Sequence, residues 1–114
     1  MDAHTQPTLV LEFGAVTAAV SLASDTDRST YSLGKDKSND FVHAGELTSR
    51  LHARIERQHK DYYLIDCSTN GTYVQTEDEQ VTRVHRDKLK LWGEGWISLG
   101  EPLHTGQPIF FRQG

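Results

Sequence analysis

The sequence predicts an all-β fold, specifically an antiparallel β-sandwich of about ten short strands. Short apolar or alternating segments recur roughly every eight to twelve residues, a spacing that is typical of sandwiches. Polar turns, several of them containing glycine, separate these segments. No stretch carries the ~3.6-residue apolar period of an amphipathic helix, so we expect no helix.

The first predicted strands surround Gly14. Residues 8–13 and 15–22 are strand-like and flank this glycine, which predicts a β-hairpin. Residues 24–29 are polar, and we expect a loop there. The next strand is predicted at residues 30–33, which alternate between polar and apolar side chains and end at a glycine.

Two clearer strands follow in the middle of the chain. In residues 51–56 apolar and polar side chains alternate, and this period of two predicts a half-buried strand. Leu51, Ala53 and Ile55 alternate there with His52, Arg54 and Glu56. After a turn at 58–61, residues 62–65 are apolar on both faces, which predicts a central strand. Shorter strands are predicted at 72–74, 81–84, 96–99 and 108–111, with an acidic loop tip at 75–80.

Length and composition predict one globular domain. The chain has 114 residues, 36% of them hydrophobic and 25% charged, which is too apolar and too mildly charged for a disordered protein. We expect a flexible N-terminus at residues 1–7 and a single domain at residues 8–114. No apolar run approaches the ~20 residues of a membrane span, and the polar N-terminus does not resemble a secretory signal. Cys67 is the only cysteine, which excludes an internal disulfide and favours a cytoplasmic location.

The charge balance argues against a nucleic-acid-binding protein. The net charge is −4, so no overall basic field attracts a polyanion. An anionic ligand would therefore need a local cluster of cations. The candidates for such a cluster are Lys35, Lys37, Arg50 and Arg54.

Three polar loops at predicted strand ends carry hydrogen-bond donors. They contain, in order, Gly34 and Lys35, Ser49 and Arg50, and Thr69 and Asn70. Loops of a sandwich gather at its two ends, so several of them can face one ligand. A phosphate group carries about −1.5 to −2 charges and three acceptor oxygens, and it requires converging donors such as these. The pattern predicts a phosphate-binding interaction domain rather than an enzyme.

The same residues resemble the signature of the forkhead-associated (FHA) domain. That signature is Gly-Arg, then Ser-x-x-His, then Asn-Gly, and it is similar to Gly34-Lys35, Ser49-Arg50-Leu51-His52 and Asn70-Gly71-Thr72. The resemblance covers about residues 30–100, including Asn39-Asp40 and the segment 66–72. It implies an FHA/SMAD-like antiparallel β-sandwich of about eleven strands that binds phosphothreonine peptides at one loop apex.

The resemblance also implies a role for each site residue. Lys35 stands in the place of the phosphate-binding arginine of the family, and Ser49 would donate to a phosphate oxygen. Arg50 would contact the phosphate or the peptide backbone. Thr69 would lie at the phosphate rim, and Asn70 would hold the peptide main chain. Four further residues would shape the loops without touching the ligand, namely Gly34, His52, Gly71 and Thr72.

Lys35 is the one departure from the signature. Lysine keeps the positive charge but replaces the planar two-donor fork of arginine with a flexible point donor. Losing one charge-assisted hydrogen bond costs roughly 1.5–3 kcal/mol, or about 10- to 150-fold in affinity. A second, narrower resemblance of residues 85–100 is to FHA domains attached to bacterial adenylate or guanylate cyclases, which implies a regulatory domain of such a parent protein.

Two alternatives to phosphopeptide binding stay open. One is a phospho-independent scaffold or dimerisation domain that uses a sandwich face or a sheet edge. The other is an enzyme, but no catalytic spacing supports it. The residues near the same loops that could carry acid–base chemistry are Asp36, Asp40, His43, Ser49 and His52. The six histidines are scattered, so we expect no metal site. We also expect no cofactor and no catalytic residue. The aromatic residues Tyr62, Tyr63, Trp92 and Trp96 are expected to pack in the core or at sheet edges, with Trp92 the most exposed.

Overall fold

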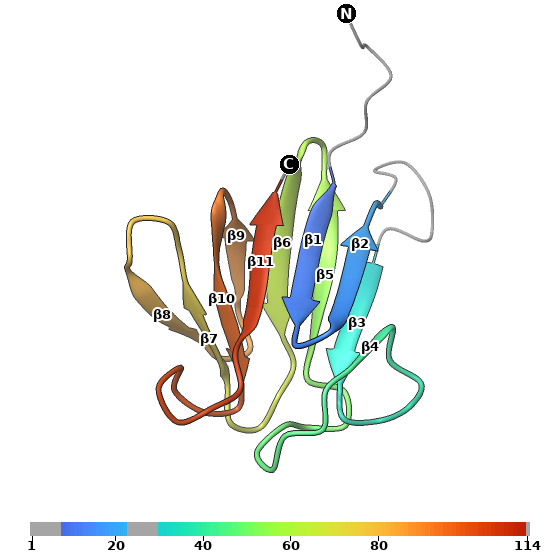
Figure 1. Cartoon of the computed structure of the whole chain (residues 1–114), viewed down its shortest axis with the longest axis vertical. Helices are drawn as coiled ribbons and strands as arrows, with labels where there is room; N and C mark the ends of the chain where they lie inside the picture. The colour runs from blue at the N-terminus through green and yellow to red at the C-terminus, as the bar shows by residue number, and fades with distance from the viewer. Residues whose placement is uncertain (1–7, 23–29, 114) are drawn as a thin grey trace, which may run out of the picture.

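The computed structural model describes residues 8–22 and 30–113, and these residues form a two-layered β-sandwich (Figure 1). The six-stranded sheet has the order β2 (Val16–Val20), β1 (Leu9–Phe13), β11 (Ile109–Gln113), β10 (Glu94–Leu99), β7 (Thr72–Gln75) and β8 (Val81–Val84). The five-stranded sheet has the order β4 (Phe41–Val42), β3 (Thr30–Gly34), β5 (Ala53–Gln58), β6 (Asp61–Asp66) and β9 (Lys88–Leu91). All neighbouring strands of these sheets are antiparallel except β3 and β4, which are parallel. The all-β sandwich predicted from the sequence is confirmed.

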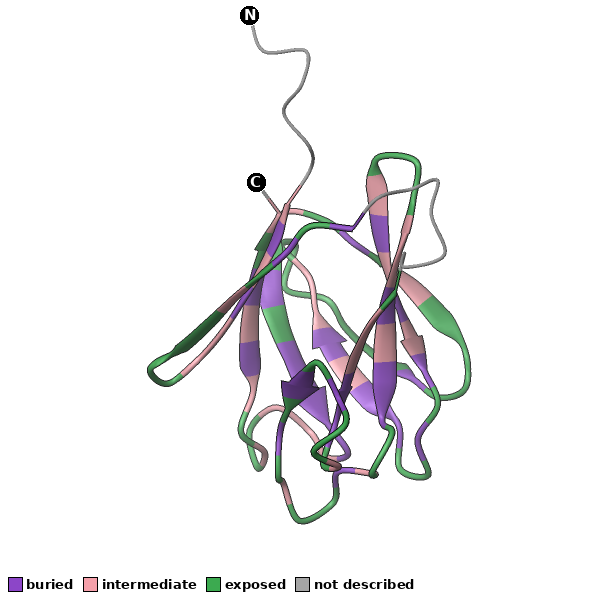
Figure 2. Cartoon of the chain, turned by 90° about the vertical axis from the view of Figure 1, so that its right-hand side faces the viewer, coloured by how far each residue is buried: buried purple, intermediate pink, exposed green. Residues whose placement is uncertain are grey.

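The core lies between the two sheets and is built from alternate residues of their strands (Figure 2). In β1, for example, Leu9 and Leu11 are fully buried, while the residues between and after them are only half-buried. Burying such a side chain contributes roughly 1.5–3 kcal/mol. The hydroxyl of Tyr62 on β6 adds a polar link between the layers, because it donates to Val20 O (3.2 Å) and accepts from Leu22 N (3.2 Å).

The alternation predicted for residues 51–56 is wrong at its first two positions. Leu51 is 63% exposed, His52 is fully buried, and β5 begins only at Ala53. The physical reason is that His52 forms hydrogen bonds with both of its ring nitrogens, which draws the ring inward and leaves Leu51 in the loop. From Ala53 onward the predicted inward positions are correct, since Ala53 and Ile55 are buried.

The strand predicted at 62–65 is β6, and it lies inside its sheet between β5 and β9. Only one of its faces is fully buried, because Tyr63 and Ile65 on the other face are half-buried. The ammonium group of Lys88 covers the Tyr63 ring, with 5.2 Å between the nitrogen and the ring centroid. The structure also contains β4 and β9, which the strand pattern did not predict.

The predicted loop at 24–29 and the predicted flexible N-terminus at 1–7 lie outside the described residues. Both tryptophans are partly exposed, but Trp96 (42%) is more exposed than Trp92 (39%), contrary to expectation. Trp96 lies on β10, with its ring edge-to-face against Phe110 at a centroid distance of 5.1 Å. The described part of the chain contains no helix of the length and apolarity that crossing a membrane requires.

Strand register brings three loops to one end of the molecule, the lower end in Figure 1. Leu33 of β3 pairs with Ala53 of β5, and Ala53 pairs with Asp66 of β6. The chain therefore leaves β3, enters β5 and leaves β6 at the same end of the five-stranded sheet. We call these segments the 35–40 loop, the 43–52 loop and the 67–71 loop, and the end that they form the apex.

Candidate functional site

The 35–40 loop and the 43–52 loop run side by side and share backbone hydrogen bonds. Lys35 N donates to Ser49 O (2.9 Å), Asp36 N donates to Arg50 O (3.1 Å) and His52 N donates to Leu33 O (2.9 Å). These bonds continue the β3–β5 pairing beyond the end of the sheet. They set Lys35 and Ser49 next to each other at the apex.

A buried asparagine joins these two loops a second time. Asn39 is 6% exposed, and its side-chain amide donates to Asp36 O (2.8 Å) and to Arg50 O (2.6 Å). Gly34 leaves room for this contact, because a Cβ atom there would lie 2.2 Å from Arg50 O and 2.8 Å from the Asn39 amide nitrogen. Any larger residue at position 34 would separate the loops.

His52 connects the 43–52 loop to the 67–71 loop. Its Nδ1 accepts from Ser49 N (2.9 Å), and its Nε2 contacts Gly71 O at 2.9 Å. Since Gly71 O can only accept, Nε2 carries the proton and the ring is neutral. Burial lowers the pKa of His52, and it outweighs the opposing effects of the Gly71 hydrogen bond and the nearby Asp66 carboxylate.

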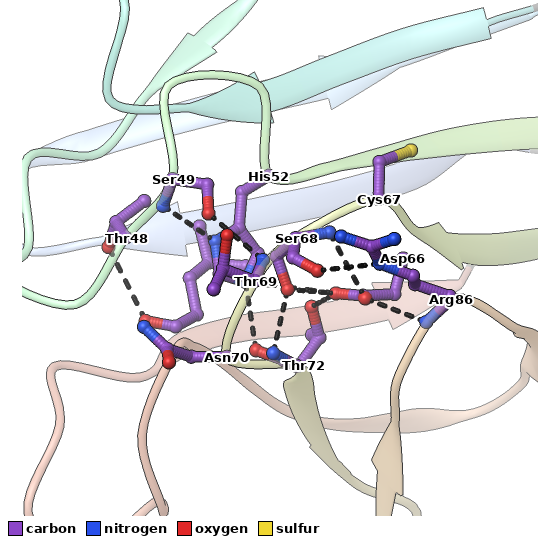
Figure 3. Close-up of polar contacts among 12 residues, drawn as sticks. Thr48, Ser49, His52, Asp66, Cys67, Ser68, Thr69, Asn70, Thr72 and Arg86 are labelled. Atoms are coloured by element: carbon purple, nitrogen blue, oxygen red, sulfur yellow. Dashed lines mark hydrogen bonds and ion pairs between the residues drawn. The ribbon is translucent and has the colours of Figure 1, made fainter.

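The Asp66 carboxylate organises the 67–71 loop from inside (Figure 3). Oδ1 accepts from the hydroxyls of Ser68 and Thr72, both at 2.7 Å. Oδ2 accepts from the backbone N–H groups of Ser68 (3.1 Å) and Arg86 (2.8 Å). Burial alone would raise the pKa of Asp66, but these four hydrogen bonds hold it below its ordinary value. Ser68 Oγ in turn accepts from Gly71 N (2.7 Å), which closes the loop.

The tip of the 67–71 loop lies against the 43–52 loop through polar side chains. Thr69 N donates to Ser49 Oγ at 3.3 Å (Figure 3). Asn70 Nδ2 donates to Leu47 O, also at 3.3 Å. Thr69 and Asn70 are exposed and Ser49 is half-buried. Gly71 has a φ of +91°, a backbone conformation that glycine adopts at no steric cost. The loop can therefore turn directly from Asn70 into β7.

Two cations complete the apex. Lys35 and Arg50 are both exposed, and the ammonium of Lys35 forms no ion pair with any described residue. Arg50 Nη2 lies 3.8 Å from Asp36 Oδ1. Arg54, which the sequence placed in the same candidate cluster, is instead on β5, where its Nε donates to Glu56 Oε2 at 2.8 Å.

All five residues predicted to contact a phosphopeptide thus come from the three loops of the apex: Lys35, Ser49, Arg50, Thr69 and Asn70. Together they present an ammonium, a guanidinium, two hydroxyls and a carboxamide. Such a set is suited to an anion flanked by a polar backbone. Of the four predicted loop-shaping residues, Gly34, His52 and Thr72 are buried in the contacts described above, and Gly71 supplies the turn.

The acidic and histidine side chains near the apex are engaged in loop structure. Asp36 accepts two hydrogen bonds from Ser38, and Asp40 accepts from Ser32 N (2.8 Å). His43 is buried, and burial together with the neighbouring His52 lowers its pKa. Among residues 8–22 and 30–113, no three His, Cys, Asp or Glu side chains form a group that could hold a metal ion.

Asp66 and Asn39 were included in the resemblance to the FHA signature, but the sequence analysis assigned neither of them a role. A signal for Asp66 was present, because Tyr62, Leu64 and Asp66 share one face of β6 and the first two are core residues. An acid in an inward position at the end of a strand indicates a carboxylate that accepts several loop hydrogen bonds. For Asn39 no comparable pattern exists, since its partners Asp36 and Arg50 lie on two different loops.

Comparisons with known proteins agree with this architecture. The sequence profile of the FHA domain matches residues 31–91, more than half of the chain. The FHA-1 domain of Mycobacterium tuberculosis Rv1747 is 21% identical, with a TM-score of 0.76 and coverage of 96% of this chain and 99% of that one. The FhaA FHA domain, solved with the intracellular domain of Rv3910, is 24% identical, with a TM-score of 0.65 and coverage of 94% and 100%.

A third similar structure is the N-terminal FHA domain of S. cerevisiae Rad53p, solved in complex with a phosphothreonine peptide. It is 18% identical, with a TM-score of 0.64 and coverage of 96% of this chain and 92% of that one. No curated protein sequence matches the chain. The structural likenesses establish the shared sandwich. With the profile match over residues 31–91, they show that the chain belongs to the forkhead-associated (FHA) domain family.

Proposed function

We propose that this domain binds proteins or peptides that contain phosphothreonine, and that it does so through the apex. The observation that carries the proposal is the joining of three loops into one surface by His52, Asn39 and the Ser49–Thr69 contact. The likeness to a domain solved with a phosphothreonine peptide supports the choice of ligand. The loops that carry these residues are already joined in the unliganded domain, so binding requires little ordering of the backbone.

Ser49 is assigned to the phosphate. Its Oγ already accepts the Thr69 N–H at 3.3 Å, so the hydroxyl proton is directed away from that contact and can be donated to a phosphate oxygen. The exposed guanidinium of Arg50 and the ammonium of Lys35 then supply positive charge beside the same oxygen atoms. The Thr69 hydroxyl is assigned to the rim of the phosphate site.

Asn70 is assigned to the peptide main chain. Its side-chain nitrogen donates to Leu47 O at 3.3 Å, which fixes the orientation of the amide. The side-chain oxygen has no partner among the described residues and is free to accept a peptide N–H. Because this contact is made to the main chain of the peptide, it anchors the peptide without selecting its sequence.

Lys35 sets the expected strength of binding. A lysine offers one point donor where arginine offers two parallel N–H groups to a phosphate. We therefore propose a weaker phosphate interaction than an arginine at this position would give. Arg50 supplies the second cation of the site.

As a binding module, the domain needs no catalytic residue and no cofactor. We propose that residues 8–114 act as one interaction module in signalling, in the cytoplasm, where protein kinases generate phosphothreonine. A regulatory role in a larger parent protein, such as a nucleotide cyclase, is compatible with the resemblance of residues 85–100. Finding a cyclase, kinase or phosphatase encoded in or beside the same reading frame would test that extension.

Three matched peptide libraries with randomised flanks test the ligand. They carry phosphothreonine, phosphoserine or threonine at one fixed position, and their retention by immobilised domain is compared. Selective retention of the phosphothreonine library is expected, and equal retention of all three contradicts the proposal. The best phosphothreonine sequence is then titrated by calorimetry.

Ser49→Ala and Asn70→Ala are the matching variants. Loss of one charge-assisted hydrogen bond in Ser49→Ala lowers affinity by about 10- to 150-fold. Thr17→Ala, on the exposed edge strand β2, is a control that should bind as the wild type does. The alternative of a phospho-independent dimerisation domain predicts a stable dimer in light scattering that Ser49→Ala leaves unchanged.

A further inference from the structure

Asp36 lies within the apex, but its ionised carboxylate can only accept hydrogen bonds and so cannot donate one to a phosphate. It follows Lys35 directly, and its carboxylate Oδ1 lies 3.8 Å from Arg50 Nη2. The Arg50 side chain is 85% exposed, and the Asp36 side chain is 37% exposed. A negative charge beside a phosphate site repels the ligand, so phosphate binding does not explain why an acid stands at position 36.

The position of this carboxylate is fixed by neighbouring contacts. The Ser38 hydroxyl (2.5 Å) and the Ser38 N–H (3.0 Å) both donate to Oδ2. Asn39 holds the backbone of both Asp36 and Arg50, with amide contacts of 2.8 and 2.6 Å to their carbonyl oxygens. Since Oδ2 is engaged by Ser38, Oδ1 is the oxygen left to face a cation. The Ser38 hydrogen bonds and then Arg50 lower the pKa of Asp36, so the carboxylate is charged at neutral pH.

Asp36 also lines a shallow hollow on the apex together with Ser38, Arg50 and Leu51. Leu51 is 63% exposed and supplies the apolar part of the lining of this hollow. A hollow with one carboxylate and one exposed leucine matches a long basic side chain, whose methylene groups pack on apolar surface while its charged end reaches an acid. In the unliganded domain, the guanidinium of Arg50 lies near this carboxylate.

We propose that Asp36 is a specificity-determining residue that selects phosphopeptides with a lysine or arginine close to the phosphothreonine. This inference rests on the proposed function. When a phosphate draws Arg50 toward itself, Asp36 loses its cationic neighbour. A basic side chain of the peptide then takes the place of the Arg50 guanidinium beside Oδ1 and packs its stem on Leu51. An acidic side chain at the same peptide position is disfavoured, because it adds a second negative charge next to Asp36.

The phosphothreonine library described above tests this selection. Wild-type domain should enrich lysine or arginine over glutamate at one flanking position. The corresponding peptide should bind roughly two- to fivefold more tightly than its alanine counterpart, as expected for a solvent-exposed ion pair. Raising the salt concentration should reduce that ratio, because exposed charge pairs are screened. This arm needs no variant of the protein.

Charge variants identify the residue responsible. Asp36→Asn keeps a side-chain oxygen for Ser38 and should abolish the preference for a basic residue, and Asp36→Lys should reverse it toward glutamate. Glu46→Lys is the matched control, because Glu46 is an exposed acid on the neighbouring 43–52 loop, and it should leave the preference in place.

The outcomes separate this inference from the proposed function. Phosphothreonine binding without a basic preference overturns the role of Asp36 and leaves the proposed function standing. The role of Asp36 is also overturned if Asp36→Lys leaves the preference for a basic peptide residue unchanged. It is overturned as well if Glu46→Lys removes this preference as completely as Asp36→Lys does. Absence of any phosphothreonine-dependent binding overturns the proposed function itself.

Discussion

The carboxylate of Asp66 is the contact on which the 67–71 loop depends most, and Asp66→Asn tests that dependence. The wild-type carboxylate accepts four hydrogen bonds from Ser68, Thr72 and Arg86. In the variant, one oxygen becomes an N–H₂ group. The backbone N–H groups of Ser68 and Arg86 cannot reverse, so the remaining oxygen must face them. The hydroxyls of Ser68 and Thr72 must then turn round to accept.

The expected cost follows from the change in these bonds. Hydrogen bonds to a charged group contribute about 1.5–3 kcal/mol, and neutral ones about 0.5–1.5 kcal/mol. Two backbone bonds therefore weaken by roughly 1 kcal/mol each, and the two reversed hydroxyl bonds add a further loss. We expect the free energy of unfolding to fall by about 2–4 kcal/mol, and Tm to fall by roughly 10–20 °C. This is a large share of the ~5–15 kcal/mol that stabilises a typical domain.

Urea denaturation at neutral pH measures the change, and its pH dependence checks the cause. Because the pKa of Asp66 is lowered in the folded state, its contribution is complete above the unfolded pKa of about 3.9. It is lost as the pH falls toward the lower folded value. The difference between wild type and Asp66→Asn should therefore shrink below about pH 4.

Asp78→Asn is the matched control for this experiment. Asp78 also accepts hydrogen bonds, from Thr76 Oγ1 (2.6 Å) and Gln80 N (3.2 Å), but it is fully exposed at a hairpin tip. It should destabilise the domain much less than Asp66→Asn. Equal effects of the two variants, or a change below about 0.5 kcal/mol for Asp66→Asn, would refute the reasoning.

Three further predictions concern binding, backbone geometry and pH. Lys35→Arg should tighten phosphopeptide binding about tenfold in a polarisation titration, since it restores a bidentate donor, and unchanged affinity would speak against phosphate contact at this position. Gly71→Ala should lower the free energy of unfolding by about 1–2 kcal/mol in urea melts. The reasons are that φ is +91° at this position and that the new Cβ would lie 3.0 Å from Arg83 Nε. An unchanged free energy of unfolding would contradict this prediction. His43 and His52 both have lowered pKa values in the folded domain. The free energy of unfolding should therefore decrease as the pH drops below the unfolded histidine pKa of about 6.5. Equal stability at pH 7 and pH 5 would contradict neutral histidine rings in the folded domain.

Local patterns in the sequence were sufficient to predict most of the strands. Alternating and apolar segments predicted the hairpin of β1 and β2 and the strands β3, β6, β7, β8, β10 and β11, because side-chain burial on a sheet has a period of two. They also predicted β5, although the strand begins at Ala53, two residues later than expected. The two-residue strand β4 is too short to produce such a pattern. The edge strand β9 has exposed lysines at Lys88 and Lys90, and only Leu91 of the strand is fully buried, so its signal was weak.

The candidate site was predicted as a set of residues but not as a set of contacts. Loop order and side-chain chemistry identified Ser49 and Asn70, and the structure brings both to the apex. The inward position of His52 and the outward position of Leu51 depend on hydrogen bonds to Ser49 and Gly71, which a repeating pattern cannot reveal. The pairing of Asp36 with Arg50 depends likewise on two loops that meet only in the folded chain.

The central claim is that phosphothreonine binds at the apex. An NMR titration of the isotopically labelled domain with the selected phosphothreonine peptide tests it residue by residue. The largest backbone amide shifts should occur at Lys35, Ser49, Arg50, Thr69 and Asn70, and the unphosphorylated peptide should cause none of them. Shifts concentrated on the outer face of the six-stranded sheet, or equal shifts with both peptides, would contradict the claim.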